Sequence, residues 1–328
     1  MIIKIPKMIS KVTRIAVTTR VLFNLEYEHK IFKEKGLDAF HEYQKEHIST
    51  PLEKGVGFDL VDKLLKFNTK IGTDYIQVAI ISRNDPFPAG ARVMKSVEFY
   101  GLPISQFFFT GGTDITRYLH AYDISLFLSL NSKSVATALS AGLPAAQLVI
   151  PTGIVPSPSM LSPIDIDTDI KTDSISDQLR VAFDGDSVLF SDEAQAVYDK
   201  SGLHAFREHE ELKKDIPLPD GPLKPFLTLI ANAQKICKEK DIDCPFRTYL
   251  ATSRGDTSSY RVMTTFEKWG IHTDEMFMLS GVKKTPILKT IAPHIFLDDN
   301  RSFVEDASLH GIPSACVSAD LCPSPTSE

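Results

Sequence analysis

Two carboxylates that stand one residue apart carry the most informative chemistry in the sequence. Asp184 and Asp186 follow directly on the apolar stretch Val181 to Phe183. Such a stretch is typical of a buried strand, which would place both side chains at the carboxyl end of a sheet, where α/β folds bind their ligands. Two like charges so close are tolerated best beside a divalent cation, and carboxylate oxygens suit Mg²⁺. Taken alone, the pair is equally consistent with a strand that ends in an Asp-Gly turn.

Three further apolar stretches in the second half of the chain end in residues suited to phosphate binding. Thr252 and Ser253 offer hydroxyls and nearby backbone N–H groups to phosphate oxygens. The lysine pair 283–284 offers positive charge. Asp298 and Asp299 form a second acidic pair that would complete an oxygen-ligated metal site. Each motif by itself fits a helix cap, a solvated surface or a turn, but their joint occurrence in this order favours a phosphoryl-transfer site.

The elements that must position these residues alternate between short apolar strands and amphipathic helices, which is the pattern of a parallel sheet with helical crossovers. Helical spacing of apolar residues extends over 191–213, with Ser191 or Asp192 as the N-cap, and over 260–269. The segment 191–246 should be mostly helical and could roof the site. Strands are expected at Ile15 to Val17, Ile76 to Ile81, Leu126 to Leu130, Val181 to Phe183, Thr248 to Ala251, Met276 to Leu279 and Ile295 to Leu297, with a short one near Leu148 to Ile150.

The first half of the chain resembles the second half segment by segment, which predicts an internal duplication. Lys35-Gly-Leu-Asp-Ala-Phe-His-Glu42 matches Ser201-Gly-Leu-His-Ala-Phe-Arg-Glu208 in this way. We therefore expect an N-terminal repeat over 1–150 and a C-terminal catalytic domain over 179–328. Between them, 151–178 is rich in Pro, Ser and Asp and is expected to be a linker or long loop.

The first copy lacks the acidic residues of the second. Thr18 and Thr19 stand where the first acidic pair is expected, and Ser129 with Leu130 where the second is expected. A site without carboxylates cannot hold a metal in this geometry. We therefore expect the first half to be catalytically silent and to have a structural role.

Composition and charge exclude several classes of protein. A formal net charge of -6 over 328 residues provides no basic surface, so a nucleic-acid polymer is not expected as a partner. No apolar run is long enough to span a membrane, and the first residues lack the features of a secretory signal. The four cysteines show no Cys-x-x-Cys spacing, which indicates reduced thiols and a cytoplasmic protein. Whether the chain forms a homo-oligomer stays open at this point.

Taken together, Asp184-Gly-Asp186, Thr252, Lys284 and Asp298-Asp299 resemble the four motifs of the haloacid dehalogenase (HAD) superfamily of phosphohydrolases. More narrowly, VAFDGDSVLFSDE, CPFRTYLATSR and PHIFLDDN, with AVTTRVLFNLE in the first half, resemble the cytosolic 5'-nucleotidase type I family, whose members hydrolyse nucleoside monophosphates. The resemblance covers most of the chain. It implies an α/β fold of two tandem, duplicated HAD-like (Rossmannoid) parallel-sheet units, of which the second is catalytic and carries a small helical cap segment.

The resemblance also implies a role for each residue. Asp184 would attack phosphorus and become an aspartyl phosphate. Asp186 would protonate the leaving oxygen and then activate water, with its backbone carbonyl on the metal. Mg²⁺ would be bound by Asp184 and Asp299, with Asp298 in support. The phosphoryl oxygens would be held by Thr252, Ser253 and Lys284, the last of which matches the family's motif position better than Lys283.

Two other functions compete with a 5'-nucleotidase. A HAD phosphatase for another small phosphomonoester, such as a sugar phosphate, would use the same four motifs, because these say nothing about the leaving group. A non-catalytic nucleotide-binding regulator is disfavoured, because the second half keeps every charged motif. The preferred base and sugar are not fixed by the sequence.

Overall fold

The computed structural model describes residues 12–150 and 178–319. The expected linker therefore lies outside the described residues except for Gln178. The chain divides into two compact units, Met1–Phe127 and Leu128–Glu328, and each is described by itself. The division falls inside strand β6 (Ile124–Ser129), and the repeat boundary expected at residue 150 remains a prediction.

Unit 1 is an α/β unit in which β1 (Thr13–Thr18), β4 (Ile76–Ser82) and β5 (Gln106–Phe109) pair in parallel. With β6 beside β1, the strand order is β6, β1, β4, β5. A two-stranded sheet pairs β2 (Phe23–Asn24) with β3 (Glu53–Lys54). The helices are α1 (Thr19–Leu22), α2 (Glu26–Glu46), α3 (Phe58–Ile71), α4 (Ala91–Phe99) and α5 (Thr116–Ala121), and a π-helical turn η1 (Pro86–Gly90) precedes α4.

Unit 2 contains the motifs and has the strand order β10, β9, β8, β11, β12, β7. The sheet has five strands that are parallel to one another, namely β8 (Leu179–Phe183), β9 (Phe246–Thr252), β10 (Glu275–Met278), β11 (Ile295–Asp298) and β12 (Ser314–Cys316). The sheet is mixed, because β7 (Ala145–Val149) pairs antiparallel with β12. The helices are α6 (Ser132–Ser140), α8 (Glu193–Leu212), α9 (Lys224–Lys240), α10 (Ser258–Trp269), α11 (Thr285–Ile291) and α12 (Arg301–Leu309).

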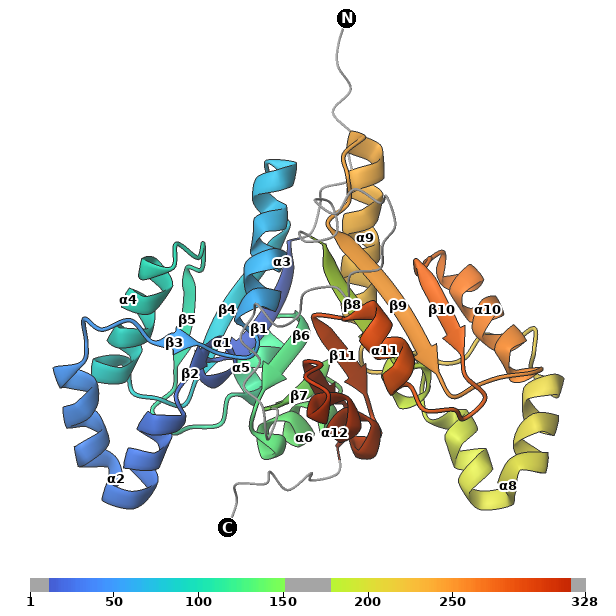
Figure 1. Cartoon of the computed structure of the whole chain (residues 1–328), viewed down its shortest axis with the longest axis horizontal. Helices are drawn as coiled ribbons and strands as arrows, with labels where there is room; N and C mark the ends of the chain where they lie inside the picture. Colours follow the sequence, from blue (N-terminus) through green and yellow to red (C-terminus); the bar gives the residue numbers. More distant parts are fainter. Residues whose placement is uncertain (1–11, 151–177, 320–328) are drawn as a thin grey trace, which may run out of the picture. The chain divides into compact units, whose positions relative to one another are not determined.

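The strand order of unit 2 reverses next to β8. The chain passes from β8 to β9 on one side and later places β11 on the other side. In doubly wound sheets the ligand crevice lies at such a point, outside the carboxyl ends of the strands. In Figure 1 the arrowheads of these strands point toward the end of the sheet at which α8 (yellow) lies.

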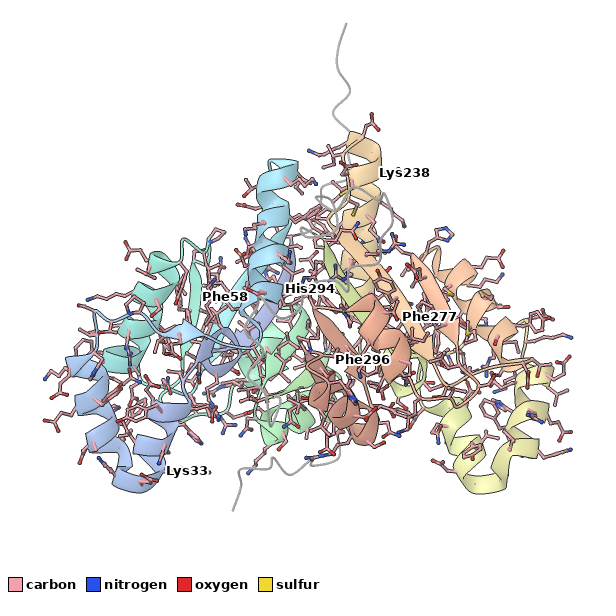
Figure 2. The ribbon with its side chains drawn as sticks, in the orientation of Figure 1. Lys33, Phe58, Lys238, Phe277, His294 and Phe296 are labelled. Carbon is pink, nitrogen blue, oxygen red and sulfur yellow. The ribbon has the colours of Figure 1, made fainter. Side chains whose placement is uncertain are left out.

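The core of unit 2 follows from the apolar strands. Ala182 on β8, Tyr249 on β9 and Phe296 on β11 pack with residues of α11 and α12, and Phe277 on β10 adds a partly buried ring (Figure 2). Burial of a large apolar side chain stabilises a fold by about 1.5–3 kcal/mol. The motif residues follow the carboxyl ends of these packed strands.

Each of the strands expected from an apolar run is present. The helix expected over 191–213 is also present as α8, with Asp192 as N-cap residue, while the Ser191 hydroxyl accepts a hydrogen bond from Glu193 N at 3.3 Å. The helix is not continuous, because Gly202 has φ 77° and ψ -177° and kinks it. A positive φ of this kind is readily accessible only to glycine.

Candidate active site

Four strand ends of unit 2 bring the motif residues to one edge of its sheet. Asp184 follows β8, Thr252 ends β9, and Asp298 ends β11. Lys284 follows β10 and stands at the start of α11. Since β8 and β11 pair in parallel with Phe183 opposite Leu297, the two acidic motifs must meet, and Asp184 N donates a hydrogen bond to Leu297 O at 2.8 Å.

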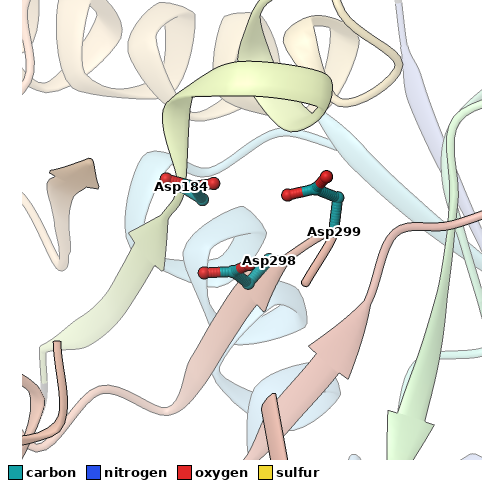
Figure 3. Close-up of side chains that lie close together, drawn as sticks. All are labelled: Asp184, Asp298 and Asp299. Atoms are coloured by element: carbon teal, nitrogen blue, oxygen red, sulfur yellow. The ribbon is translucent and has the colours of Figure 1, made fainter. Parts of the chain in front are cut away.

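An acidic group is formed by Asp184, Asp298 and Asp299, and Figure 3 shows their side chains around one small region. One carboxylate oxygen of each lies within 4.8 Å of those of the other two. Asp298 is fully buried and Asp184 is 7% exposed. Three carboxylates this close, two of them buried and Asp299 half-buried, repel one another strongly unless protons or cations compensate them.

Lys284 supplies one positive charge to this group. Its Nζ lies 2.7 Å from Asp184 Oδ1 and 2.6 Å from Asp298 Oδ2, and the side chain is 1% exposed. Burial alone would lower the pKa of Lys284, but the charges of Asp184 and Asp298 raise it on balance. The lysine therefore stays protonated, and one ammonium compensates only part of the charge of three carboxylates.

The negative charge that Lys284 does not compensate raises the pKa values of the acids, together with burial. Burial, followed by the charge of Asp298, raises the pKa of Asp184 to about 7. Burial, followed by the charge of Asp184, raises the pKa of Asp299 to about 7. Burial also raises the pKa of Asp298, although Lys284 opposes the shift. The group is therefore poised to bind either protons or a cation near neutral pH.

The donor set fits a hard divalent cation. All the ligand atoms offered are carboxylate oxygens, which Mg²⁺ prefers in proteins. Asp184 Oδ1 is buried and accepts no hydrogen bond of good geometry, in spite of the nearby Lys284 ammonium. A buried carboxylate oxygen without a hydrogen bond is costly, and a metal ion would satisfy it.

Thr252 lies beside the loop that carries Asp184. The side chain is 1% exposed, and its Oγ1 accepts a hydrogen bond from Arg254 N at 3.2 Å. A Cβ added to Gly185 would lie 3.0 Å from Thr252 Oγ1, so glycine permits the close approach of the two strand ends. Ser253, by contrast, is exposed, and its backbone carbonyl accepts a hydrogen bond from Gly281 N.

Asp186 is not part of the acidic group; its carboxylate turns to Arg254 instead. Arg254 Nε donates to Asp186 Oδ2 at 2.8 Å, and Nη2 donates to Oδ1 at 2.7 Å. The sequence interpretation missed Arg254, although it stands two residues after Thr252. No signal in the sequence pairs it with a residue 68 positions earlier, because the contact depends on β8 and β9 being neighbours.

The corresponding strand ends of the first half of the chain, at β1 and β6, carry hydroxyls in place of the acidic residues. Thr18 ends β1 and Ser129 ends β6. Within residues 12–150 and 178–319, the acidic group of unit 2 is the one cluster of at least three potential metal ligands.

Comparison with known proteins gives a consistent result. A 5'-nucleotidase family model matches residues 5–322. Cytosolic 5'-nucleotidase 1B of Homo sapiens is 35% identical over 305 residues, which cover 90% of this chain and 47% of that protein. The chain thus spans about half the length of this relative. No solved structure matches this chain. Among the residues that the structure describes, no helix has the length and hydropathy of a membrane span. The extent of the family match shows that this chain belongs to the 5'-nucleotidase family.

Proposed function

We propose that this chain is a Mg²⁺-dependent 5'-nucleotidase that hydrolyses nucleoside 5'-monophosphates to nucleoside and phosphate through an aspartyl phosphate on Asp184. The observation that carries the proposal is the acidic group of unit 2 at the reversal point of the strand order, in which the buried Asp184 and Asp298 share the buried Lys284 ammonium and the half-buried Asp299 lies beside them. Membership of the 5'-nucleotidase family supports the choice of substrate.

Asp184 is the nucleophile in this proposal, as the resemblance of Asp184-Gly-Asp186 to the first HAD motif implies, and its buried Oδ1 accepts no hydrogen bond of good geometry. Its attack on phosphorus gives an acyl phosphate and releases the nucleoside oxygen. Asp299 and Asp184 would hold Mg²⁺, which when bound screens the repulsion between a carboxylate and an anionic phosphate. Asp298 supports the site through Lys284, whose Nζ it holds at 2.6 Å. Lys284 and Thr252, with Ser253 as a further hydroxyl, bind the phosphoryl oxygens.

Asp186 is the acid and base of the proposal. It would protonate the leaving oxygen of the nucleoside and then remove a proton from the water that hydrolyses the aspartyl phosphate. In agreement with a carbonyl rather than a carboxylate contact to the metal, the side chain of Asp186 is turned to Arg254. Proton transfer of this kind contributes typically about 10²–10⁴-fold to rate.

The proposal also includes the internal duplication, which a buried arginine in each unit supports. In unit 1, Arg92 on α4 donates to Glu28 at 2.9 Å and to Gln44 at 3.0 Å, both on α2, and its Nε donates to Thr50 O at 3.0 Å. In unit 2, Arg261 on α10 is bonded in the same way to two acidic residues of α8 and to a backbone carbonyl; these partners are Glu193 (3.1 Å), Glu210 (2.8 Å) and Ile216 O (2.9 Å).

A second set of contacts repeats beside each arginine. Ser96 Oγ donates to Arg92 O and accepts from Leu52 N, while Thr265 Oγ1 donates to Arg261 O and accepts from Leu218 N. Both clamped helices kink at a glycine with positive φ. The strand order β6, β1, β4, β5 likewise parallels β11, β8, β9, β10. A hydrogen-bond pattern repeated in this detail is hard to explain without duplication.

Within this scheme α8, which lies between the first and second motifs, forms the small cap, and the first copy is silent. The protein would work in the cytoplasm on a small-molecule substrate.

Phosphate release from a panel of nucleoside 5'-monophosphates and sugar phosphates tests the proposal. We expect the highest kcat/KM with a nucleoside monophosphate, activity that requires Mg²⁺, and no activity for Asp184→Asn. Thr18→Ala, at the corresponding strand end of the first copy, is the matched control and should retain activity. A strong preference for sugar phosphates would contradict the substrate assignment, and equal losses in the two variants would contradict the division of labour between the halves.

A further inference from the structure

The two arginine clamps differ at one buried position. Gln44 of unit 1 offers its Oε1 to Arg92 and is 2% exposed. The corresponding residue of unit 2 is Glu210, which is fully buried and offers Oε1 to Arg261 at 2.8 Å. The carboxylate has a second oxygen, Oε2, and this oxygen accepts a hydrogen bond from Arg254 Nη1. The working half therefore carries an extra buried charge where the silent half carries an amide.

Arg254 connects this extra charge with the site. The side chain is 2% exposed. One edge of its guanidinium contacts Glu210 on α8, and the Nε and Nη2 edge holds both oxygens of Asp186 at 2.8 Å and 2.7 Å. A planar guanidinium that binds a carboxylate at two points fixes its orientation as well as its position. The result is a continuous chain from Arg261 through Glu210 and Arg254 to Asp186.

Stability of the fold alone does not explain why unit 2 has the buried ion pair of Glu210 with Arg254. The clamp itself closes with a neutral amide in unit 1, where Arg92 is held by Glu28 and Gln44. Placing a carboxylate at that position in a fully buried environment costs stability unless cations compensate it. Arg261 contacts one oxygen of Glu210 but also pairs with Glu193, as Arg92 pairs with Glu28, and Arg254 supplies the further cation at the second oxygen. Arg254 also binds Asp186, whose side chain is 21% exposed at the edge of the sheet that carries the motifs. The guanidinium thus reaches a carboxylate at the site and not one in the core.

We infer that Arg254, anchored by Glu210 of α8, is a positioning residue that holds the Asp186 carboxyl group in the orientation from which, in its protonated form, it gives its proton to the leaving nucleoside oxygen and becomes the carboxylate that then acts as base. This inference rests on the proposed function, because it assigns Arg254 a role through Asp186. It makes α8 part of the catalytic framework: a displacement of α8 moves Glu210, and with it the support of the acid.

The test exploits two leaving groups. A nucleoside oxygen needs a proton to depart, whereas 4-nitrophenolate departs without one, and kcat/KM reports the steps up to its release. We expect Arg254→Ala to lower kcat/KM for the best nucleoside monophosphate by about 10²-fold or more. We expect a loss of about tenfold or less for 4-nitrophenyl phosphate, and Asp186→Asn should show the same discrimination. Guanidinium ion added to Arg254→Ala should restore part of the nucleotide activity.

Glu210→Gln is the second variant, since it recreates in unit 2 the residue that closes the clamp in unit 1 and is therefore expected to fold. It should lower the nucleotide activity selectively, to a smaller extent than Arg254→Ala. Glu28→Gln, which removes a clamp partner in unit 1, is the matched control: thermal stability falls, and the ratio of the two activities stays that of the wild type.

Equal losses of both activities in Arg254→Ala and Glu210→Gln, without guanidinium rescue, would overturn the inference in favour of a purely structural ion pair. Failure of the proposed function would be recognised separately, because the wild-type protein would then hydrolyse no nucleoside monophosphate at all. The wild-type rate with nucleotide is thus the reference for both outcomes.

Discussion

Removing the negative charge of Asp184 should abolish hydrolysis and, at the same time, stabilise the metal-free protein at pH 8. The wild-type carboxyl is 7% exposed, and its pKa is raised from 3.8 to about 7, first by burial and then by Asp298. At pH 8 the group is ionised in both the folded and the unfolded protein. A rise of that size then costs about 4 kcal/mol of stability, at about 1.4 kcal/mol per pKa unit.

Asparagine removes this cost but buries an amide with incomplete hydrogen bonding, which costs about 1–3 kcal/mol. The net expectation for Asp184→Asn in excess EDTA at pH 8 is a gain of about 1–3 kcal/mol in the free energy of unfolding. At pH 5 the Asp184 carboxyl of the folded wild-type protein is protonated, so burial of this group costs less than about 2 kcal/mol of stability. The stability gain of Asp184→Asn therefore disappears at this pH. Stability of the wild-type protein without metal therefore falls as pH rises from about 4 to about 7.

Urea unfolding followed by far-UV circular dichroism at the two pH values measures these differences. Asp199→Asn on the exposed surface of α8 is the matched control and should change stability little at either pH. If Asp184→Asn is no more stable than the wild type at pH 8 without metal, the acidic group does not carry the uncompensated charge that we derive.

Three further predictions concern the metal ion, the contact between Gly185 and Thr252, and the packing of Gly221. Mg²⁺ at 100 times its Kd should stabilise the wild-type protein by about 2.7 kcal/mol at pH 8. The same concentration should stabilise it much less at pH 5, where protons compete for Asp184 and Asp299, and Asp299→Asn should lose the effect. Thermal unfolding with and without EDTA measures the stabilisation, and a shift that does not depend on pH would contradict the prediction. Gly185→Ala should lower kcat/KM about tenfold or more in phosphate-release assays, because its Cβ would lie 3.0 Å from Thr252 Oγ1; wild-type activity would show that Thr252 tolerates displacement. Gly221→Ala should lower the free energy of unfolding by about 2 kcal/mol or more, because its Cβ would lie 2.3 Å from the backbone oxygen of Phe190; a smaller change in urea unfolding would show that the loop yields.

The strand ends of unit 2 could be predicted from sequence because each follows an uninterrupted apolar run, and such runs mark buried strands. The short strands could not be predicted so easily. β12 has only three residues, too few for a periodicity to be recognised, and β5 was not predicted although it has four half-buried residues, as β10 does. The kink in α8 was equally hidden, because an isolated glycine in a helical pattern does not reveal its φ.

The site was predictable in its residue types but not in its pairings. Lys284 was expected to bind the phosphoryl group, and the structure adds that it forms ion pairs with Asp184 and Asp298. The hydrogen bonds that link Asp186 to Arg254 and Arg254 to Glu210 connect the loop after β8, the end of β9 and α8. Neither contact is local in sequence. Such contacts follow from tertiary packing, and a single sequence contains no direct signal for them.

The central claim, that Asp184 forms a covalent intermediate, can be tested by trapping. Wild-type protein mixed with Mg²⁺ and a nucleoside monophosphate is quenched with borohydride, which reduces an acyl phosphate to an alcohol, and the peptides are analysed by mass spectrometry. The account predicts reduction at Asp184 that requires both substrate and Mg²⁺. Turnover without any reduced residue, or reduction at Asp186, Asp298 or Asp299 instead, would contradict it.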